Sequence, residues 1–209
     1  MEISLTGAGK KFYSDWIFRN VSLHLKDGSR TAITGPNGSG KSTFIQVLAG
    51  AVMLTEGKVM YSANEKPVAD DQVYRHMSFA SPYLEVIEEF TLKEMVEFHR
   101  SMKPSAYTTE EMLCDSGLEG KADSVIKFFS SGMKQRVRLT LALLTAAPVI
   151  LLDEPCSNLD NSGVQWYRQM IDKHGTGKTI IVASNNHEEE YFFCSEQITM
   201  TQLKNGTSR

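Results

Sequence analysis

The sequence predicts an α/β fold in which a mainly parallel β-sheet is covered by helices on both faces. Residues 149–152 read Val-Ile-Leu-Leu, and a strand that is apolar throughout is typical of a sheet buried on both sides. Short β-prone segments alternate with segments of helical spacing, which is the order expected when helices connect parallel strands. A glycine-rich loop between one such strand and the following helix fits the same architecture.

The N-terminal region is expected to form strands. Residues 3–6 and 21–25 alternate apolar and polar side chains, as a strand with one buried face does. A turn is expected at 26–28, where Lys-Asp-Gly follows the second run. Residues 31–34 are short, mainly apolar and β-prone and end at Gly35, so a third strand is expected there.

The middle of the chain changes from mixed to helical character. A helix is expected over 41–49, because its apolar side chains can be buried together, and Gly50 should end it. Short strands are expected at 58–61 and 77–79. From about 91 to 144 the apolar spacing is helical and strand signals are few, so this stretch is predicted to be a helical insert.

The C-terminal third returns to alternating strands and helices. The apolar run at 149–152 predicts a strand, a helix is expected near 164–173, and a further strand is expected over 179–183. At 209 residues the chain fits one ordinary domain, or one core with a small inserted lobe.

Composition and charge exclude several classes of protein. The chain has 41% hydrophobic and 22% charged residues, as soluble globular proteins do. A net charge of −3 provides no basic field, so direct binding to nucleic acid is not expected. No apolar run approaches the roughly 18 residues of a membrane span, and the first residues do not resemble a signal peptide. We therefore expect a cytoplasmic protein that reaches the inner face of the membrane only through another chain.

The three cysteines, Cys114, Cys156 and Cys194, are an odd number without metal-type spacing. This fits a reducing compartment. We expect them to be small buried apolar residues rather than ligands.

Residues 35–42, called the phosphate loop below, carry the pattern G-x-x-x-x-G-K-[ST] between an expected strand and an expected helix. Glycines let the backbone wrap closely around phosphate oxygens, and the helix N-terminus adds its positive dipole end. We expect Lys41 to bridge the β- and γ-phosphates of ATP and the Ser42 hydroxyl to bind Mg²⁺. The residues predicted to hold the nucleotide here are Gly35, Pro36, Asn37, Gly38, Ser39, Gly40, Lys41, Ser42 and Thr43.

Two carboxylates follow the apolar strand, at Asp153 and Glu154. Ligands of parallel α/β sheets bind at the carboxyl ends of the strands. Asp153 is therefore expected to reach Mg²⁺, through water, and Glu154 to polarise the water that attacks the γ-phosphorus. An acidic pair can also simply end a strand, but the phosphate loop in the same chain favours the catalytic interpretation.

Residues 129–136 read Phe-Ser-Ser-Gly-Met-Lys-Gln-Arg. This run resembles the signature of ABC ATPases, usually Leu-Ser-Gly-Gly-Gln: Ser130 and Gly132 match, whereas Ser131 and its neighbours are variants. A serine before a glycine at a helix start offers a hydroxyl and free N–H groups to an anion. Residues 157–160, Ser-Asn-Leu-Asp, resemble the D-loop of the same family, with Asp160 as its acidic residue.

The resemblance covers nearly the whole chain and implies a P-loop NTPase core at about 1–85 and 147–209. It further implies an N-terminal antiparallel β subdomain and an α-helical signature subdomain at about 86–146. Two such modules, as a homodimer or heterodimer, bind head to tail, so that Ser130, Ser131 and Gly132 serve the partner's γ-phosphate. A separate transmembrane subunit would dock near the helical subdomain, with Pro82, Tyr83, Leu84 and Phe90 as candidate contacts.

Three further positions carry expectations from the family. Phe12 stands where an aromatic side chain stacks on adenine, with Tyr13 as a possible substitute. Ser81 replaces the usual glutamine near Mg²⁺, so water or Glu85 would have to complete the site. Asn185 replaces the usual switch histidine; an amide can donate a hydrogen bond but carries no charge.

His187, two residues after Asn185, is the alternative γ-phosphate sensor, although it could equally be a solvated residue at a helix start. Because Glu154 is retained, ATP hydrolysis is predicted to survive but to be slowed. The favoured function is the ATP-hydrolysing subunit of an ABC transporter. A non-transport ABC ATPase that acts on ribosomes or DNA, and a module that uses ATP only to dimerise, are the alternatives.

Overall fold

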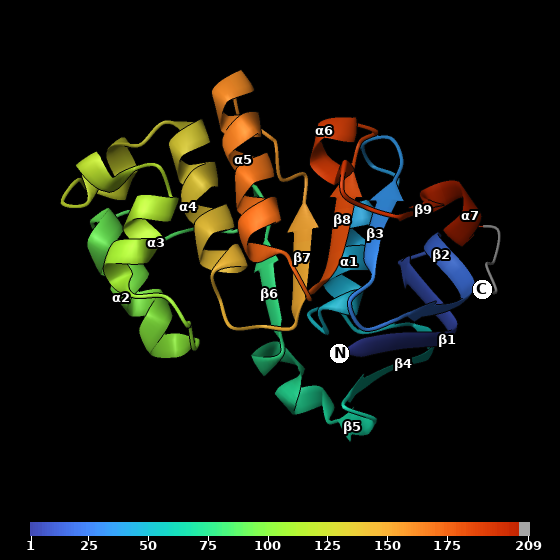
Figure 1. Ribbon diagram of the computed structural model, residues 1–209. Coiled ribbons are helices and arrows are strands. Elements are labelled where there is room, and N and C mark those ends of the chain that lie inside the picture. Colours follow the sequence, from blue (N-terminus) through green and yellow to red (C-terminus); the bar gives the residue numbers. More distant parts are fainter. Residues whose placement is uncertain (205–209) are drawn as a thin grey trace.

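The computed structural model describes residues 1–204 and arranges them in two sheets with flanking helices (Figure 1). The antiparallel sheet has the order β2-β1-β4-β5 and comprises β1 Glu2–Phe12, β2 Asp15–Leu25, β4 Glu56–Ala63 and β5 Lys66–Val68. The parallel sheet has the order β6-β7-β8-β3-β9 and comprises β3 Arg30–Thr34, β6 Met77–Ala80, β7 Val149–Asp153, β8 Thr179–Ser184 and β9 Glu196–Thr199. The predicted fold class is confirmed.

The α-helices of the described residues are α1 Lys41–Leu48, α2 Leu92–Met102, α3 Thr109–Asp115, α4 Ser131–Leu143, α5 Asn161–His174, α6 Glu188–Tyr191 and α7 Met200–Lys204. Short 3-10 turns lie at Asp70–Arg75, Glu119–Lys121 and Ile126–Phe128. In the sequence, helices α2, α3 and α4 follow β6 and precede β7, where the helical insert was predicted, and Figure 1 shows them to one side of these two paired strands. Among residues 1–204 no helix has the length and apolar character needed to cross a bilayer.

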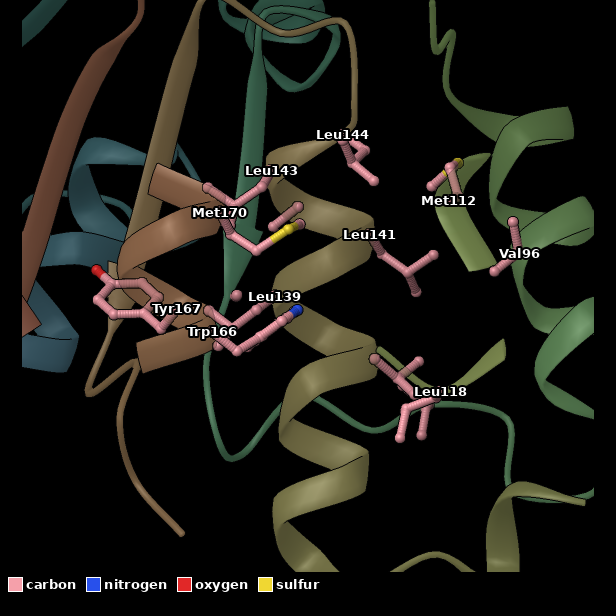
Figure 2. Close-up of a cluster of buried hydrophobic side chains, with 14 of the residues drawn as sticks. Val96, Met112, Leu118, Leu139, Leu141, Leu143, Leu144, Trp166, Tyr167 and Met170 are labelled. Atoms are coloured by element: carbon pink, nitrogen blue, oxygen red, sulfur yellow. The ribbon is translucent and has the colours of Figure 1, made fainter. Parts of the chain in front are cut away.

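The central strand β7 is apolar throughout because both of its faces are covered. Leu151 packs in a core with α1 and the antiparallel sheet, whereas its neighbour Ile150 packs in a second core with α4 and α5. Figure 2 shows this second core, in which α4 places Leu139 and Leu141 between α5 and the rest of the helical insert. Burying both faces of a parallel strand in this way agrees with the sequence-based prediction.

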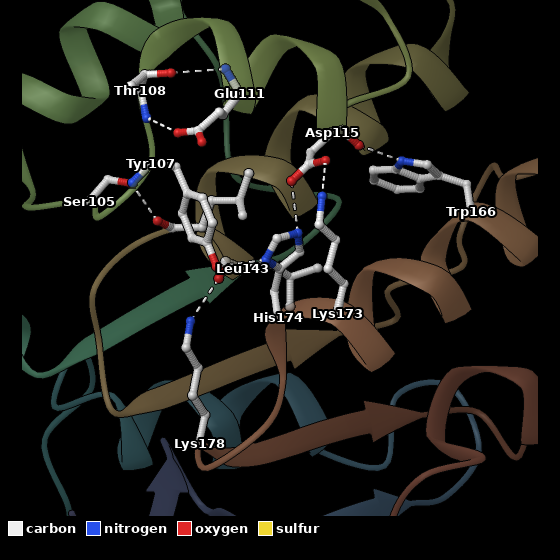
Figure 3. A network of polar contacts seen from close by, with 11 residues as sticks. Ser105, Tyr107, Thr108, Glu111, Asp115, Leu143, Trp166, Lys173, His174 and Lys178 are labelled. Atoms are coloured by element: carbon white, nitrogen blue, oxygen red, sulfur yellow. Dashed lines mark hydrogen bonds and ion pairs between the residues drawn. The ribbon is translucent and has the colours of Figure 1, made fainter.

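A polar cluster also ties the insert to α5 (Figure 3). The Asp115 carboxylate at the end of α3 lies 2.6 Å from Lys173 Nζ and 2.9 Å from His174 Nε2. The other ring nitrogen of His174 is 2.9 Å from the Tyr107 hydroxyl, and Trp166 Nε1 donates to the Asp115 carbonyl at 2.8 Å. The insert is therefore attached to the core by specific polar contacts as well as by apolar packing.

The register of the parallel sheet brings the ends of three strands to one edge. Asp153 at the end of β7 pairs with Ala183, and the Glu154 N–H donates to the Ala183 carbonyl at 2.9 Å. The Gly35 N–H, just after β3, donates to the Ser184 carbonyl at 3.3 Å. The phosphate loop and the acidic pair, far apart in sequence, thus lie on either side of β8.

Several element boundaries differ from the sequence-based ones. Strand β1 runs through glycine-rich residues where no alternation predicts it, because pairing with β2 and β4 holds it extended despite register shifts. Helix α5 begins at Asn161 instead of near 164, since Asp160 caps it by accepting the Gly163 N–H at 2.7 Å.

The expectation of buried cysteines was wrong for Cys114, which is exposed. Met112 and Leu113 occupy the buried face of α3, so the next residue points outward. Cys156 and Cys194 are half-buried.

Candidate functional site

The phosphate loop turns from the end of β3 into the N-terminus of α1. Gly40 has a φ of 106°, and a Cβ placed on it would lie 2.2 Å from Ile17 Cγ2, so only glycine fits there. Ile17 belongs to β2, which means that the antiparallel sheet packs against the loop and fixes its shape. Helix α1 follows directly, with free backbone N–H groups at its first turn that suit phosphate oxygens.

Lys41 lies between the loop and the acidic pair. Its ammonium group donates to the Gly35 carbonyl at 2.9 Å and to the Pro36 carbonyl at 3.2 Å. It also lies 3.8 Å from Glu154 Oε1. Lys41 is 4% exposed, so its charge acts in a region largely shielded from water. This is where a cation is needed if a γ-phosphate binds between the loop and Glu154.

Asp153 is buried at the end of β7, where two hydroxyl groups flank it. Ser81 Oγ donates to Asp153 Oδ2 at 3.4 Å, whereas Oδ1 has no hydrogen-bond partner among the described residues. Burial raises the pKa of this carboxyl, against the opposing effect of hydrogen bonds from Ser42 and Ser81. A buried carboxylate with a free oxygen beside hydroxyl groups fits Mg²⁺. No group of three or more His, Cys, Asp or Glu within residues 1–204 could hold a metal, so water and phosphate oxygens would complete the coordination.

Glu154 adopts an unusual backbone conformation, with a φ of 46°. Its carbonyl accepts the Ser157 N–H at 3.0 Å, which helps to hold this turn. Left-handed backbone at a residue other than glycine costs on the order of 1 kcal/mol and is common at functional sites. The side chain lines a pocket of about 180 Å³. We call it the hydrolysis pocket; its lining comprises Asn37, Glu154, Cys156, Ser157, Asn185, His187, Glu189 and Glu190.

Both candidate γ-phosphate sensors line the hydrolysis pocket. Asn185 is half-buried just after β8, whereas the His187 side chain is 59% exposed and lies 3.8 Å from a Glu189 carboxylate oxygen. The structure thus brings Asn185 to the same wall as Glu154 and leaves His187 in the pocket as an alternative. Glu85, considered as a substitute for the missing glutamine, lines a separate pocket beside α2.

The two candidate adenine-stacking residues sit at the turn between β1 and β2. Phe12 is 45% exposed, and Lys10 Nζ lies 4.7 Å from the centre of its ring. Tyr13 is fully exposed and has a φ of 53° in the turn itself. Phe12 therefore presents an accessible ring that is already partly ordered by a cation–π contact.

The signature residues lie at the N-terminus of α4, on a different surface. Ser130 caps the helix by accepting the Met133 N–H at 3.2 Å. Ser130, Ser131 and Gly132 line a pocket of about 420 Å³ together with Asp160. Hydrogen bonds with Gly163 and Ser162 lower the pKa of the Asp160 carboxyl. This signature pocket shares no lining residue with the hydrolysis pocket.

One contact that the sequence did not indicate links the two surfaces. Gln135, in the second turn of α4, is fully buried, and its Nε2 donates to the Pro155 carbonyl at 3.0 Å. The helix that carries the signature is thereby bonded to the loop that carries Glu154. A glutamine on a helix has many uses, so no sequence signal could have identified this contact.

Comparison with known proteins identifies the family. The family model described as ABC transporter matches residues 18–157. The chain belongs to this family. It is 31% identical over 196 residues to the cytochrome c biogenesis ATP-binding export protein CcmA of Rhizobium johnstonii, covering 90% of this chain and 88% of the relative. It is 29% identical over 208 residues to the putative hemin import ATP-binding protein HrtA of Staphylococcus epidermidis, covering 95% and 92%.

A similar solved structure contains the products of ATP hydrolysis. The dimeric post-hydrolysis structure of the ATP-binding cassette MJ0796 bound to ADP and Pi superposes with a TM-score of 0.81 at 27% identity, covering 98% of this chain and 95% of that one. The predictions of ATP binding and of ATP hydrolysis by an ABC transporter protein are confirmed. The alternative of an ATPase acting on ribosomes or DNA finds no support among these relatives.

Proposed function

We propose that this chain hydrolyses ATP at two composite sites formed head to tail with a second ABC module. The observation that carries the proposal is the separation of the hydrolysis pocket from the signature pocket. The signature pocket offers Ser130 and a helix N-terminus to an anion but has no phosphate loop beside it. A second copy, or a related module, would supply that loop. The helical segment 86–146 would move against the core of 1–85 and 147–209 as ATP binds and leaves.

The residues of each site then have distinct roles. Lys41 would bind the γ-phosphate, Asn185 would donate to it, and Glu154 would polarise the attacking water. Mg²⁺, held by Ser42 directly and by Asp153 and Ser81 through water, would neutralise charge on the phosphates. Around these residues, the nucleotide would contact Phe12, Thr43 and the phosphate loop of one module and Ser130, Ser131, Gly132 and Asp160 of the other.

We further propose that a separate transmembrane subunit binds beside β6 on the cytoplasmic side. Tyr83 is 79% exposed and Leu84 41% exposed, and Leu84 borders an adjoining pocket of about 260 Å³ with Val86 and Met95. Exposed apolar side chains around a concave surface are typical of protein interfaces. Phe90, the remaining candidate contact, packs edge-on against Phe98 and is half-buried.

Phosphate release from purified protein tests the catalytic assignment. Glu154→Gln should lower the rate at least about 100-fold, because it removes a general base, while ATP binding persists. Glu188→Gln removes an exposed carboxylate outside the hydrolysis pocket and should leave the rate unchanged. Equal rates for the wild type and Glu154→Gln would refute the role of Glu154.

Ser81 stands in place of the usual glutamine, and Asn185 in place of the usual switch histidine. These two replacements favour a second candidate, a module that binds ATP and dimerises but scarcely hydrolyses the nucleotide. The wild-type turnover distinguishes the two. Release of phosphate that depends on Mg²⁺ and is lost in Glu154→Gln supports the slowed ATPase, whereas ATP-dependent dimers without phosphate release support the second candidate.

A further inference from the structure

Glu190 is a buried carboxylate in the wall of the hydrolysis pocket. It lies in the short helix α6 and is 2% exposed, although the preceding Glu188 is exposed. Its backbone is fixed from the other side, because the buried Tyr167 hydroxyl donates to the Glu190 carbonyl at 2.8 Å. The side chain therefore has little freedom to turn away from the pocket.

One carboxylate oxygen holds the loop that carries Glu154. Glu190 Oε1 accepts the N–H of Cys156, two residues beyond Glu154, at 3.2 Å. Gln135 holds the intervening Pro155 carbonyl from α4, so the loop is bonded from both sides. Since the Glu154 backbone is left-handed, these bonds oppose its relaxation to an ordinary conformation.

The other oxygen, Oε2, is buried and makes no hydrogen bond of normal geometry among residues 1–204, although the Ser184 hydroxyl lies near the carboxyl. Leaving a buried polar atom incompletely satisfied destabilises a fold, so such an atom calls for a functional explanation. The same side chain lines the pocket that contains Glu154 and Asn185.

We propose that Glu190 is a positioning residue for ATP hydrolysis, which fixes the Glu154 loop through the Cys156 N–H in the wall of the hydrolysis pocket. The inference rests on the proposed role of Glu154.

Glu190 can act in this way as a neutral carboxyl. Burial raises the pKa of Glu190 to about 7, and the nearby Ser184 hydroxyl and the Cys156 N–H oppose this rise. The neutral form can still accept the Cys156 N–H at Oε1, whereas the ionised form places a second negative charge near Glu154. The titratable groups around Glu190 are Glu154 and Cys156 from the loop, His187, Glu189 and Tyr191 from its own segment, Tyr167 from α5, and Cys194.

The test compares steady-state ATP hydrolysis by the wild-type protein, Glu190→Ala, Glu190→Gln and the matched control Glu188→Gln. Glu190→Ala loses the acceptor for Cys156 and should lower kcat about tenfold, with ATP binding changed less than about twofold, since small displacements of a catalytic group are costly. Glu190→Gln keeps an acceptor but cannot ionise. As pH rises through about 7, its kcat/KM should rise relative to the wild type, because only the wild type acquires the extra charge.

The ratio to the wild type cancels pH effects that both proteins share, such as the titration of ATP itself. Glu188→Gln should show the wild-type rate and pH profile. A wild-type kcat for folded Glu190→Ala, or a ratio for Glu190→Gln that is flat across pH 7, would overturn the proposal. Should Glu190→Ala not fold, the Glu190→Gln ratio decides. Full hydrolysis by Glu154→Gln would instead overturn the proposed function, whatever the Glu190 variants do.

Discussion

Replacing Asp153 by Asn should stabilise the nucleotide-free protein while abolishing its response to Mg²⁺. Asp153 is 1% exposed, and its Oδ1 has no hydrogen-bond partner within the described part of the chain. Burial raises its pKa above the ordinary value of an aspartate. A carboxyl whose pKa is raised by folding stabilises the fold at low pH, and this contribution is lost as pH rises through the folded-state pKa. At neutral pH the charged side chain is therefore a cost that the isosteric amide removes.

The size of the gain follows from the buried charge, which the amide removes while keeping the shape of the side chain. An incompletely compensated buried polar group costs about 1–3 kcal/mol, and a charged one costs more, so Asp153→Asn should raise the free energy of unfolding by about 1–2 kcal/mol. For a protein of this length, each kcal/mol shifts the melting temperature by roughly 2–4 °C. Wild-type protein with ATP at about 100 times its Kd should gain a further ~2.7 kcal/mol, and the part of this gain that requires Mg²⁺ should be missing from the variant.

Asp115→Asn is the matched control, because it makes the same chemical change at a carboxylate that has partners (Figure 3). The buried His174 ring lies 2.9 Å from this carboxylate, whereas the exposed Lys173 contact should contribute little. Asp115→Asn should therefore lower the free energy of unfolding by about 1–2 kcal/mol. The assay is the melting temperature of the wild type, Asp153→Asn and Asp115→Asn, each measured with and without nucleotide and Mg²⁺. Melting of nucleotide-free Asp153→Asn below the wild type, as for Asp115→Asn, would refute the reasoning.

Three other substitutions test separate parts of the molecule. Asn185→His should raise the hydrolysis rate severalfold by restoring a ring that can carry charge near the γ-phosphate; an unchanged or lower rate would count against Asn185 as the sensor. Gly132→Ala would place a Cβ 2.8 Å from the Asn158 carbonyl and should weaken ATP-dependent dimerisation, measured by sedimentation in a Glu154→Gln background, about tenfold or more; wild-type dimerisation would contradict the composite site. Thr91→Ala removes the capping box of α2 and should lower the melting temperature by about 2–4 °C without changing hydrolysis, and an unaltered melting curve would show that the cap is dispensable.

The parts of the site that the sequence predicted are those encoded by contiguous residues. The phosphate loop and the Asp153–Glu154 pair are local patterns, and the apolar run before the pair identifies the strand that carries them. Their proximity could be expected as well, because the carboxyl ends of parallel strands meet at one edge of a sheet.

The parts that the sequence could not predict depend on tertiary burial. Glu190 belongs to a run of three glutamates, a composition typical of a solvated helix start, and only packing against Tyr167 and Cys156 makes it a buried residue. The Gln135 contact is equally non-local. The path of β1 through Gly7 and Gly9 was also missed, since its extended backbone is imposed by its neighbours and not by its own residues.

The strand order has a consequence for how the protein is made. Strand β3, which leads into the phosphate loop, pairs with β8 and β9, and Ala32 lies opposite Val182. A ribosome adds about 5–20 residues per second, so β3 waits roughly 8–30 s for its first partner strand. During this interval the nascent chain exposes two unpaired β edges and cannot complete the nucleotide site, because Asn185, which directly follows β8, has yet to be made. Chaperones that shield apolar strands should therefore matter most for this chain before its last quarter is synthesised.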